Sequence, residues 1–356
     1  MTSDSTGPPL ARTARWMGGK VGRRADRTFR VRLVVQALFS LVCILLGVQL
    51  ARFYLAALAG DTPLPHRPPG VEGFLPISGL MGLLDWMYQG TLNAIHPAAT
   101  ILVGLALAMA FLLRKAFCSW VCPVGLLSEL LARFGRWSFG RNFRPWAWVD
   151  IPLRSLKYLL MAFFVGAVLT MSADALQLFI QSPYNRVADV KMGLFFIDLG
   201  RTGITVMGIL ILASVFVQGA WCRYLCPYGA LLGLFSWFSP TKVVRDQEAC
   251  VSCGLCDQVC MARLPVSVAD AITSPECTAC LDCMAVCPVE ETLDVRTLGR
   301  KRMSPLLFGG AVLALFLSGY VGALLGGSWS NQISDAEYVE SLPRIRSGLY
   351  THPGGN

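Results

Sequence analysis

Eight cysteines in the second half of the chain constrain its fold more than any other feature. They form two runs of equal spacing, Cys250-x2-Cys253-x2-Cys256-x3-Cys260 and Cys277-x2-Cys280-x2-Cys283-x3-Cys287, and Pro288 follows the second run. In such runs the fourth cysteine ligates the cluster of the other run, so each [4Fe–4S] cube receives four thiolates. We therefore predict one cube on Cys250, Cys253, Cys256 and Cys287, and a second on Cys277, Cys280, Cys283 and Cys260.

Two other uses of these cysteines fit the spacing less well. A structural zinc site takes four ligands, which would leave the third and fourth cysteine of each run without a role. Disulfide bridges demand a specific geometry that such closely spaced cysteines meet poorly, and they belong to oxidising compartments. The spacing therefore favours two iron–sulfur cubes assembled from reduced thiols.

The segment 241–298 resembles bacterial dicluster ferredoxins, and these eight cysteines carry the resemblance. It implies an α+β ferredoxin-like domain, which we expect to span residues 241–299. Met261, rather than proline, follows the fourth cysteine of the first run. This departure leaves the ligands unchanged and affects only the local turn.

The chain as a whole is too apolar for an ordinary soluble protein of 356 residues. Its mean hydropathy is +0.54, and only 15% of its residues are charged. Long apolar segments predict an α-helical polytopic membrane protein with about five transmembrane helices. The predicted spans cover residues 33–58, 98–113, 156–171, 204–220 and 305–325.

The distribution of lysine and arginine predicts the orientation of these spans. Both residues are frequent in the N-terminal arm, in 114–154 and in 296–302, and scarce in 59–97, 172–202 and 326–356. The positive-inside rule then places the N-terminus and the ferredoxin domain in the cytoplasm and the C-terminus in the periplasm of a bacterial inner membrane. The net charge of +9 follows from this topology, so we predict no nucleic-acid partner.

These features divide the chain into five predicted parts. They are a basic cytoplasmic arm over 1–32, a membrane domain of four helices over 33–240, the ferredoxin domain over 241–299, a fifth transmembrane helix over 300–326 and an extracytoplasmic tail over 327–356.

A second cysteine motif, CxxxCP, occurs twice. Its copies are Cys118-Ser-Trp-Val-Cys122-Pro123 and Cys222-Arg-Tyr-Leu-Cys226-Pro227, each at the predicted cytoplasmic end of a span. Because both spans run in the same direction, a pseudo-twofold axis along the membrane normal could bring the four cysteines together. The prolines predict that each second cysteine precedes a helix. We expect the helix start and nearby basic residues to lower the pKa of these thiols.

Three interpretations of the CxxxCP cysteines compete. They could hold a further metal or iron–sulfur centre, form a redox-active thiol site, or pack the entrance of a helix. Repetition of both cysteines favours the first. Two other residues allow a structural and a functional interpretation: His96 fits a hydrogen-bonded helix start better than a quinone or cofactor ligand, and Cys43 fits a small core residue.

Two CxxxCP motifs followed by a dicluster ferredoxin resemble the NapH/NosR-type membrane ferredoxins of periplasmic nitrate and nitrous-oxide reduction. The resemblance covers most of residues 33–325. It implies electron transfer between a quinone pool or cytoplasmic donor and a respiratory or reductase partner. No serine, histidine or carboxylate constellation and no phosphate-binding glycine loop is visible. The chain is therefore expected to be the electron-transfer component of an oxidoreductase system rather than a stand-alone enzyme.

Two further functions remain open on the sequence. Oxidase-assembly proteins of the FixG/CcoG type also look like membrane dicluster ferredoxins, which would make this chain a metal reductase, with copper as an example. Their large extracytoplasmic C-terminal domain is not matched by the short segment after Gly326. The clusters could instead serve as a redox sensor or a structural staple.

Overall fold

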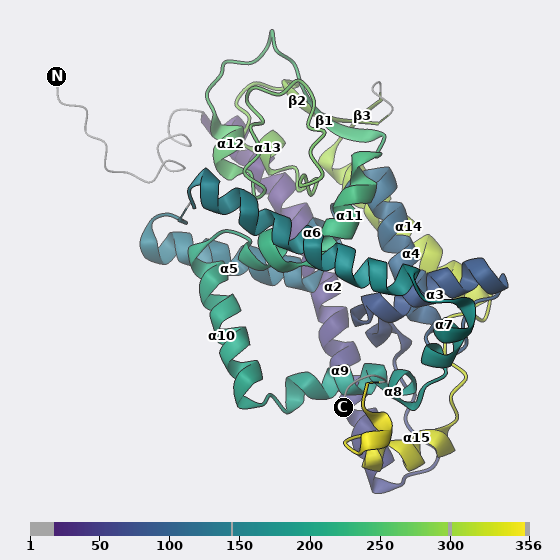
Figure 1. Ribbon diagram of the computed structural model, residues 1–356. Coiled ribbons are helices and arrows are strands. Elements are labelled where there is room, and N and C mark those ends of the chain that lie inside the picture. Colours follow the sequence, from purple (N-terminus) through teal and green to yellow (C-terminus); the bar gives the residue numbers. More distant parts are fainter. Residues whose placement is uncertain (1–17, 144, 298–300, 353–356) are drawn as a thin grey trace. The chain divides into compact units, whose positions relative to one another are not determined.

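The computed structural model describes residues 18–143, 145–297 and 301–352 (Figure 1). Arg12 and Arg15 of the predicted basic arm lie outside these ranges. The chain forms two compact units. Unit 1 comprises residues 1–39, 109–157 and 210–313, and unit 2 comprises residues 40–108, 158–209 and 314–356.

Five helices contribute residues to both units. They are α2 (Gly18–Ala59), α4 (Pro97–Leu113), α6 (Ala147–Leu169), α10 (Arg201–Phe216) and α14 (Pro305–Leu325). Each of the five predicted spans coincides with one of these helices, although α6 ends at Leu169 and α10 at Phe216.

Three of the helices are long and apolar enough to cross a membrane. The qualifying stretches are 28–59 in α2, 148–169 in α6 and 305–325 in α14. Helix α10 meets the test only together with α9 (Ala188–Ile197), to which it is bent by 77°, and α4 is a shorter apolar helix. Five complete crossings therefore stay a prediction.

Proline and glycine set several helix boundaries. Proline begins α4 and α14, where its missing N–H costs no hydrogen bond. Gly90 and Gly140 follow helices at φ values of 73° and 72°, a left-handed conformation that glycine adopts without steric cost. The local sequence therefore specifies where these helices start and stop.

Unit 1 contains a small α+β domain with a three-stranded antiparallel sheet (Figure 1). Its elements are β1 (Thr241–Arg245), α12 (Leu255–Val259), α13 (Asp282–Ala285), β2 (Leu293–Thr297) and β3 (Lys301–Met303). Val243 pairs with Val295 in the register of β1 and β2, and both are buried. Alternation of buried and more exposed residues along β1 is typical of a strand with one face on a core.

The two CxxxCP motifs of unit 1 form matching turns. A single π-helical turn, η2 (Phe117–Val121) or η3 (Trp221–Leu225), leads in each case to a cysteine in extended conformation. A helix with proline at its first position follows, α5 (Pro123–Phe139) or α11 (Pro227–Trp237). The prediction that Cys122 and Cys226 precede helices is therefore confirmed.

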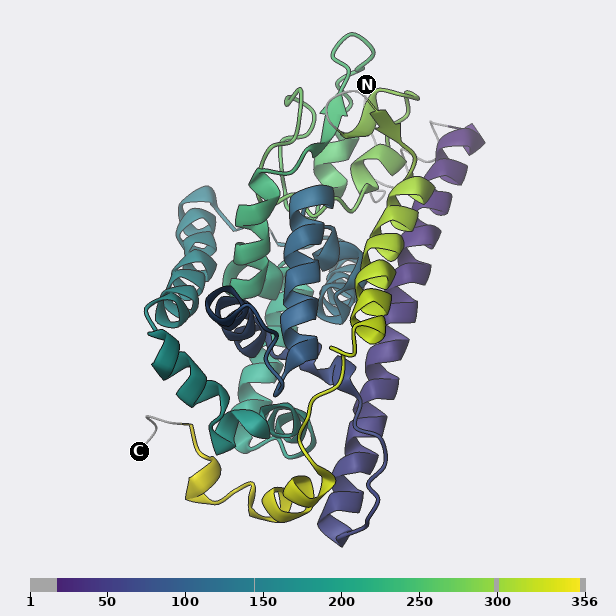
Figure 2. The same ribbon diagram turned by 90° about the vertical axis from the view of Figure 1, so that its right-hand side faces the viewer.

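Unit 2 buries an apolar core that includes the C-terminal helices. Its other elements are η1 (Pro69–Phe74), α3 (Pro76–Gln89), α7 (Ala173–Ile180), α8 (Pro183–Arg186), α9, α15 (Asp335–Ser341), η4 (Leu342–Arg344) and η5 (Gly348–Tyr350). Figure 2 shows α15, in yellow, beside the end of α2. The rings of Phe53 and Tyr338 meet there edge to face, 5.0 Å apart.

A buried polar network also lies in unit 2. Arg67 donates to Asp189 at 2.7 Å and to Glu72 at 2.6 Å. His96 Nε2 lies 2.6 Å from the Asn185 carbonyl oxygen, and its Nδ1 lies 3.3 Å from Glu72. These contacts match the interpretation of His96 as a hydrogen-bonded residue at a helix start.

Candidate iron–sulfur sites

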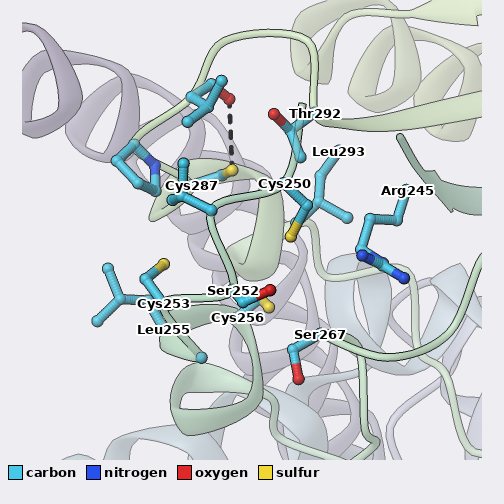
Figure 3. A pocket seen from close by; sticks show the side chains of 14 residues that line it. Arg245, Cys250, Ser252, Cys253, Leu255, Cys256, Ser267, Cys287, Thr292 and Leu293 are labelled. Carbon is cyan, nitrogen blue, oxygen red and sulfur yellow. Dashed lines mark hydrogen bonds between the residues drawn. The ribbon is translucent and has the colours of Figure 1, made fainter. Parts of the chain in front are cut away.

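Four cysteines from the two runs line one pocket of the small domain, here called pocket 1. They are Cys250, Cys253, Cys256 and Cys287. Figure 3 shows their sulfur atoms around a common space, with Arg245 and Thr292 at its edge. Cys253 is exposed, whereas Cys256 is buried. The pocket therefore opens to solvent on the side of Cys253.

The other four cysteines line a second pocket, pocket 2. They are Cys260, Cys277, Cys280 and Cys283. Leu264 donates its backbone N–H to Cys260 Sγ at 3.3 Å. N–H groups directed at ligand sulfurs stabilise negative charge, which is one way in which a protein tunes an iron–sulfur cluster. The structure thus brings together the two sets of four that the spacing predicts, each with one cysteine from the other run.

The backbone explains how each short run can curve around a pocket. Ser252 and Gly254 in the first run have φ values of 52° and 69°, and Ala279 and Leu281 occupy the same places in the second at 50° and 65°. A left-handed residue between successive cysteines reverses the chain locally. Three of these four residues are not glycine, so the sequence alone gave no signal for this repeat.

Burial makes most of the cluster thiols weak acids. It raises the pKa of Cys256 to about 11 and holds the pKa of Cys280 and Cys283 well above the usual value. Cys250 differs, because hydrogen bonds from the Ser252 backbone and from Arg245 lower its pKa. Iron at these sites would displace the thiol protons, since a metal ligand must be the thiolate.

A cluster and a single ion require different arrangements of their thiolates. Four thiolates on one tetrahedral zinc lie about 4 Å apart, given Zn–S bonds of about 2.3 Å. Within the described residues, no group of three or more histidine, cysteine, aspartate or glutamate side chains could hold one metal ion. In a cube each thiolate binds a different iron, so its ligands stand further apart. The donor set of both pockets fits a cube.

The CxxxCP turns bring four further cysteines together, here called the cysteine quartet. Its members are Cys118, Cys122, Cys222 and Cys226. Negative charge on the other three quartet cysteines disfavours ionisation of Cys118. Negative charge on Cys122 and Cys226 disfavours ionisation of Cys222. Helix α5 contacts both η2 and η3, so the two pairs of cysteines lie near the same helix. Gly229 donates its N–H to Cys226 Sγ at 3.2 Å.

The lowering of thiol pKa that we expect at the helix starts concerns Cys122 and Cys226 and stays a prediction, whereas the first cysteine of each motif has a raised pKa. Burial raises the pKa of Cys222 to about 12 and that of Cys118 well above its usual value, although Lys115 acts in the opposite direction. At these two thiols, desolvation of the charged form outweighs the effect of the nearby cation. A buried thiol with a raised pKa is a poor nucleophile, which weakens the redox-thiol interpretation.

One glycine allows the first CxxxCP turn to close. A Cβ at Gly125 would lie 2.1 Å from the Cys118 carbonyl oxygen, so only glycine fits without displacing the backbone. The equivalent Gly229 is different, because a Cβ there would lie 3.5 Å from Cys226 Sγ, an ordinary contact. The repeat therefore contains one obligatory and one permissive glycine.

Buried cations surround pocket 2 and the quartet. Arg32 donates to the Cys280 carbonyl at 3.0 Å and pairs with Glu129 and Asp282. Arg114 is fully buried and donates to the Ser274 carbonyl, while its Nε and Nη1 lack a hydrogen-bond partner within the described residues. A buried cation without a paired anion is costly, and negatively charged iron–sulfur clusters would offset its charge.

Comparison with known proteins identifies the class to which these sites belong. A 4Fe-4S dicluster domain family matches residues 242–289, and a 4Fe-4S binding domain family matches residues 95–142 and 199–245. The second match covers both CxxxCP turns. No solved structure matches the chain. Pockets of four cysteines and these domains define an iron–sulfur protein of the ferredoxin type.

Named relatives identify the family. YccM of Escherichia coli (strain K12) is 41% identical over 293 residues, which cover 80% of this chain and 82% of YccM. The ferredoxin-type protein NapH of the same organism is 29% identical over 203 residues, 54% of this chain and 66% of NapH. The regulatory protein NosR of Pseudomonas aeruginosa is 30% identical over 177 residues, 48% of this chain and 23% of NosR.

The chain belongs to the NapH/NosR-type ferredoxin family, as its sequence predicts. An electron-transfer role and iron–sulfur clusters follow from this membership.

Proposed function

We propose that this protein is a one-electron relay with one [4Fe–4S] cube in each pocket of its small domain. The observation that carries the proposal is the division of eight cysteines into two pockets, each completed by one cysteine from the other run. Bound cubes would supply reversible one-electron oxidation and reduction. The chain's own groups hold them: four sulfurs line each pocket, and backbone N–H groups donate to sulfurs such as Cys260 Sγ.

The cysteine quartet is proposed to hold a third metal or iron–sulfur centre. Four partly buried thiols are contributed by the two copies of one motif, and Lys115 lies close enough to favour the charged forms of Cys118 and Cys222. The match of both copies to a 4Fe-4S binding domain family supports the same interpretation. Because no group of three or more histidine, cysteine, aspartate or glutamate side chains among the described residues could hold a single metal ion, an iron–sulfur group fits the four thiols better than one zinc or copper ion.

We further propose that the protein is embedded in the bacterial inner membrane through five spans. Three helices of sufficient length and the two shorter predicted spans support this number. The positive-inside rule supports a cytoplasmic N-terminus and small domain and a periplasmic C-terminus. Electrons would then pass between a quinone pool or cytoplasmic donor and a redox partner protein.

A redox titration monitored by EPR tests the relay. The purified protein should show two cubes that each change by one electron at potentials a cell can reach, and a quinol should reduce at least one centre. Clusters that stay in one redox state throughout would instead support a structural staple. A variant with all four quartet cysteines changed to serine should lose iron or another metal while both cubes remain. An unchanged metal content would exclude the third centre.

Topology is tested separately by reporter fusions. A reporter at residue 270 should be active only on the cytoplasmic side, and one after residue 340 only on the periplasmic side. The opposite pattern would contradict the orientation without affecting the clusters.

A further inference from the structure

Both CxxxCP turns donate hydrogen bonds to the loops that carry the ligands of pocket 2. In the first turn, Ser119 Oγ donates to the Thr278 carbonyl at 2.5 Å and Trp120 Nε1 donates to the Ala279 carbonyl at 3.0 Å. Thr278 and Ala279 are the two residues between Cys277 and Cys280. The residues between the first turn's own cysteines therefore hold a loop between two ligands of pocket 2.

The second turn acts on the other loop of pocket 2. Arg223 Nη1 donates to the Ala262 carbonyl at 2.9 Å, two residues after Cys260. Its Nε and Nη2 donate to Asp150 at 2.9 and 2.8 Å, which fixes the guanidinium plane. A guanidinium held at three nitrogens gives a rigid contact.

Trp120 is held equally firmly. Its side chain is fully buried, and its ring lies 5.5 Å from that of Phe308. A Cβ at Gly309 of α14 would lie 2.8 Å from the indole, so the absence of a side chain there allows the ring to pack against this helix. A buried indole N–H needs an acceptor, and the Ala279 carbonyl supplies it.

The corresponding residue of the second turn has another partner. Tyr224 stands where Trp120 stands in the first turn, but its hydroxyl donates to Asp150 at 2.6 Å. The internal repeat therefore contains a matched pair of buried aromatic donors. Trp120 donates its hydrogen bond to a ligand loop, whereas Tyr224 donates its hydrogen bond to Asp150.

Pocket 1 has a different setting. Its loops are supported from within the small domain: Arg245 Nε donates to the Ala269 carbonyl at 3.1 Å, and the Asp246 N–H donates to the Thr292 carbonyl at 2.8 Å. Its ligand Cys253 is exposed. Pocket 1 thus faces solvent, whereas the loops of pocket 2 are hydrogen-bonded to the turns that carry the quartet.

We propose that Ser119, Trp120 and Arg223 are positioning residues that hold the cluster of pocket 2 next to the quartet centre. Each CxxxCP turn then has two roles. Its cysteines belong to the quartet, and a residue between them donates a hydrogen bond to a ligand loop of pocket 2. Pocket 2 is consequently the inner cluster and pocket 1 the outer cluster, which meets a soluble redox partner. This inference rests on the proposed relay function.

The matched aromatic pair provides the test. Trp120→Phe and Tyr224→Phe each remove one buried donor, and both are made in the full-length protein, purified anaerobically. Iron and sulfide per chain, the potential of each cube and the rate of iron loss to a chelator are measured. A Cys253→Ser background, which disables pocket 1, assigns the signals to the two pockets.

We expect the outer cluster to lose iron first in the unmodified protein. Trp120→Phe should shift the potential of the pocket 2 cluster and speed its iron loss about fivefold, the effect of one buried hydrogen bond. Tyr224→Phe should have a clearly smaller effect on both quantities, because Asp150 still accepts hydrogen bonds from Arg223 and Arg154 without the Tyr224 hydroxyl. Ser119→Ala, a smaller change, should act in the same direction as Trp120→Phe, which keeps the test decisive if the tryptophan variant does not fold.

Two results would overturn the inference while leaving the relay intact. One is equal behaviour of the Trp120 and Tyr224 variants at full iron and sulfide content. The other is loss of the pocket 2 cluster before that of pocket 1. Absence of iron and sulfide from the unmodified protein would instead refute the relay itself.

Discussion

The two glycines of the CxxxCP repeat provide a direct test of how the quartet is built. Alanine at position 125 would place its Cβ 2.1 Å from the Cys118 carbonyl oxygen, well inside contact distance. The backbone of Cys118 or the start of α5 must therefore move. Overpacking of this kind costs about 1–3 kcal/mol. Replacing glycine by alanine inside a helix returns at most about 1 kcal/mol.

We therefore expect Gly125→Ala to lower the free energy of unfolding by about 2 kcal/mol, the upper overpacking cost less the helix gain. The same change at Gly229 meets only ordinary contacts and should be neutral or stabilising by up to about 1 kcal/mol. Unfolding is followed in mixed micelles of increasing denaturing detergent, and bound metal is counted in parallel. Gly125→Ala should also weaken metal binding by the quartet, because Cys118 is displaced.

Equal stabilities of the Gly125 and Gly229 variants would refute this reasoning. So would full retention of the third centre in the Gly125 variant at an unchanged unfolding midpoint. Either result would mean that the first turn is looser than its geometry implies.

Three further predictions concern other contacts. Arg32→Met should destabilise the protein by about 3 kcal/mol, because it leaves Asp282 without its cation and Glu129 with Arg133 alone. Arg133→Met, at the more exposed partner of Glu129, should cost at most about 1 kcal/mol in the same unfolding assay. Cys253→Ser should remove the iron of pocket 1, whereas Cys43→Ser should leave iron and sulfide unchanged; equal contents in both variants would contradict the ligand assignment. Burial alone would lower the pKa of His96, but the charges of Glu72 and Asp189 outweigh both burial and the nearby Arg67, so the pKa is raised. The protonated His96 should therefore stabilise the fold fully below about pH 6.5, and this stabilisation should be lost as pH rises through the raised pKa. A His96→Gln variant should show a flatter dependence of unfolding on pH, and an unchanged profile would exclude this role.

Cysteine spacing predicted how the eight cysteines divide between the two pockets, and their role as ligands stays a prediction. This succeeded because a cube imposes its own ligand pattern on the sequence, independent of the surrounding fold. Proline placement likewise predicted the helix starts after Cys122 and Cys226, since proline restricts the residue before it and suits the first helical turn.

Contacts between distant segments were not predictable in this way. Arg32 and Cys280 are far apart in sequence, and nothing local in either segment indicates their hydrogen bond. The raised pKa of Cys118 and Cys222 was not predicted, because it results from burial, which depends on the tertiary fold. Trp120 was not singled out because its partner, the Ala279 carbonyl, is a backbone group without a sequence signal.

The central claim is that the eight cysteines of the small domain hold a pair of iron cubes. Iron and acid-labile sulfide per chain in anaerobically purified protein test it most directly. In the variant without the quartet cysteines we predict about eight irons and eight sulfides per chain, falling to about four of each when Cys253 is also replaced. Zinc in place of iron, with no labile sulfide, would contradict the claim.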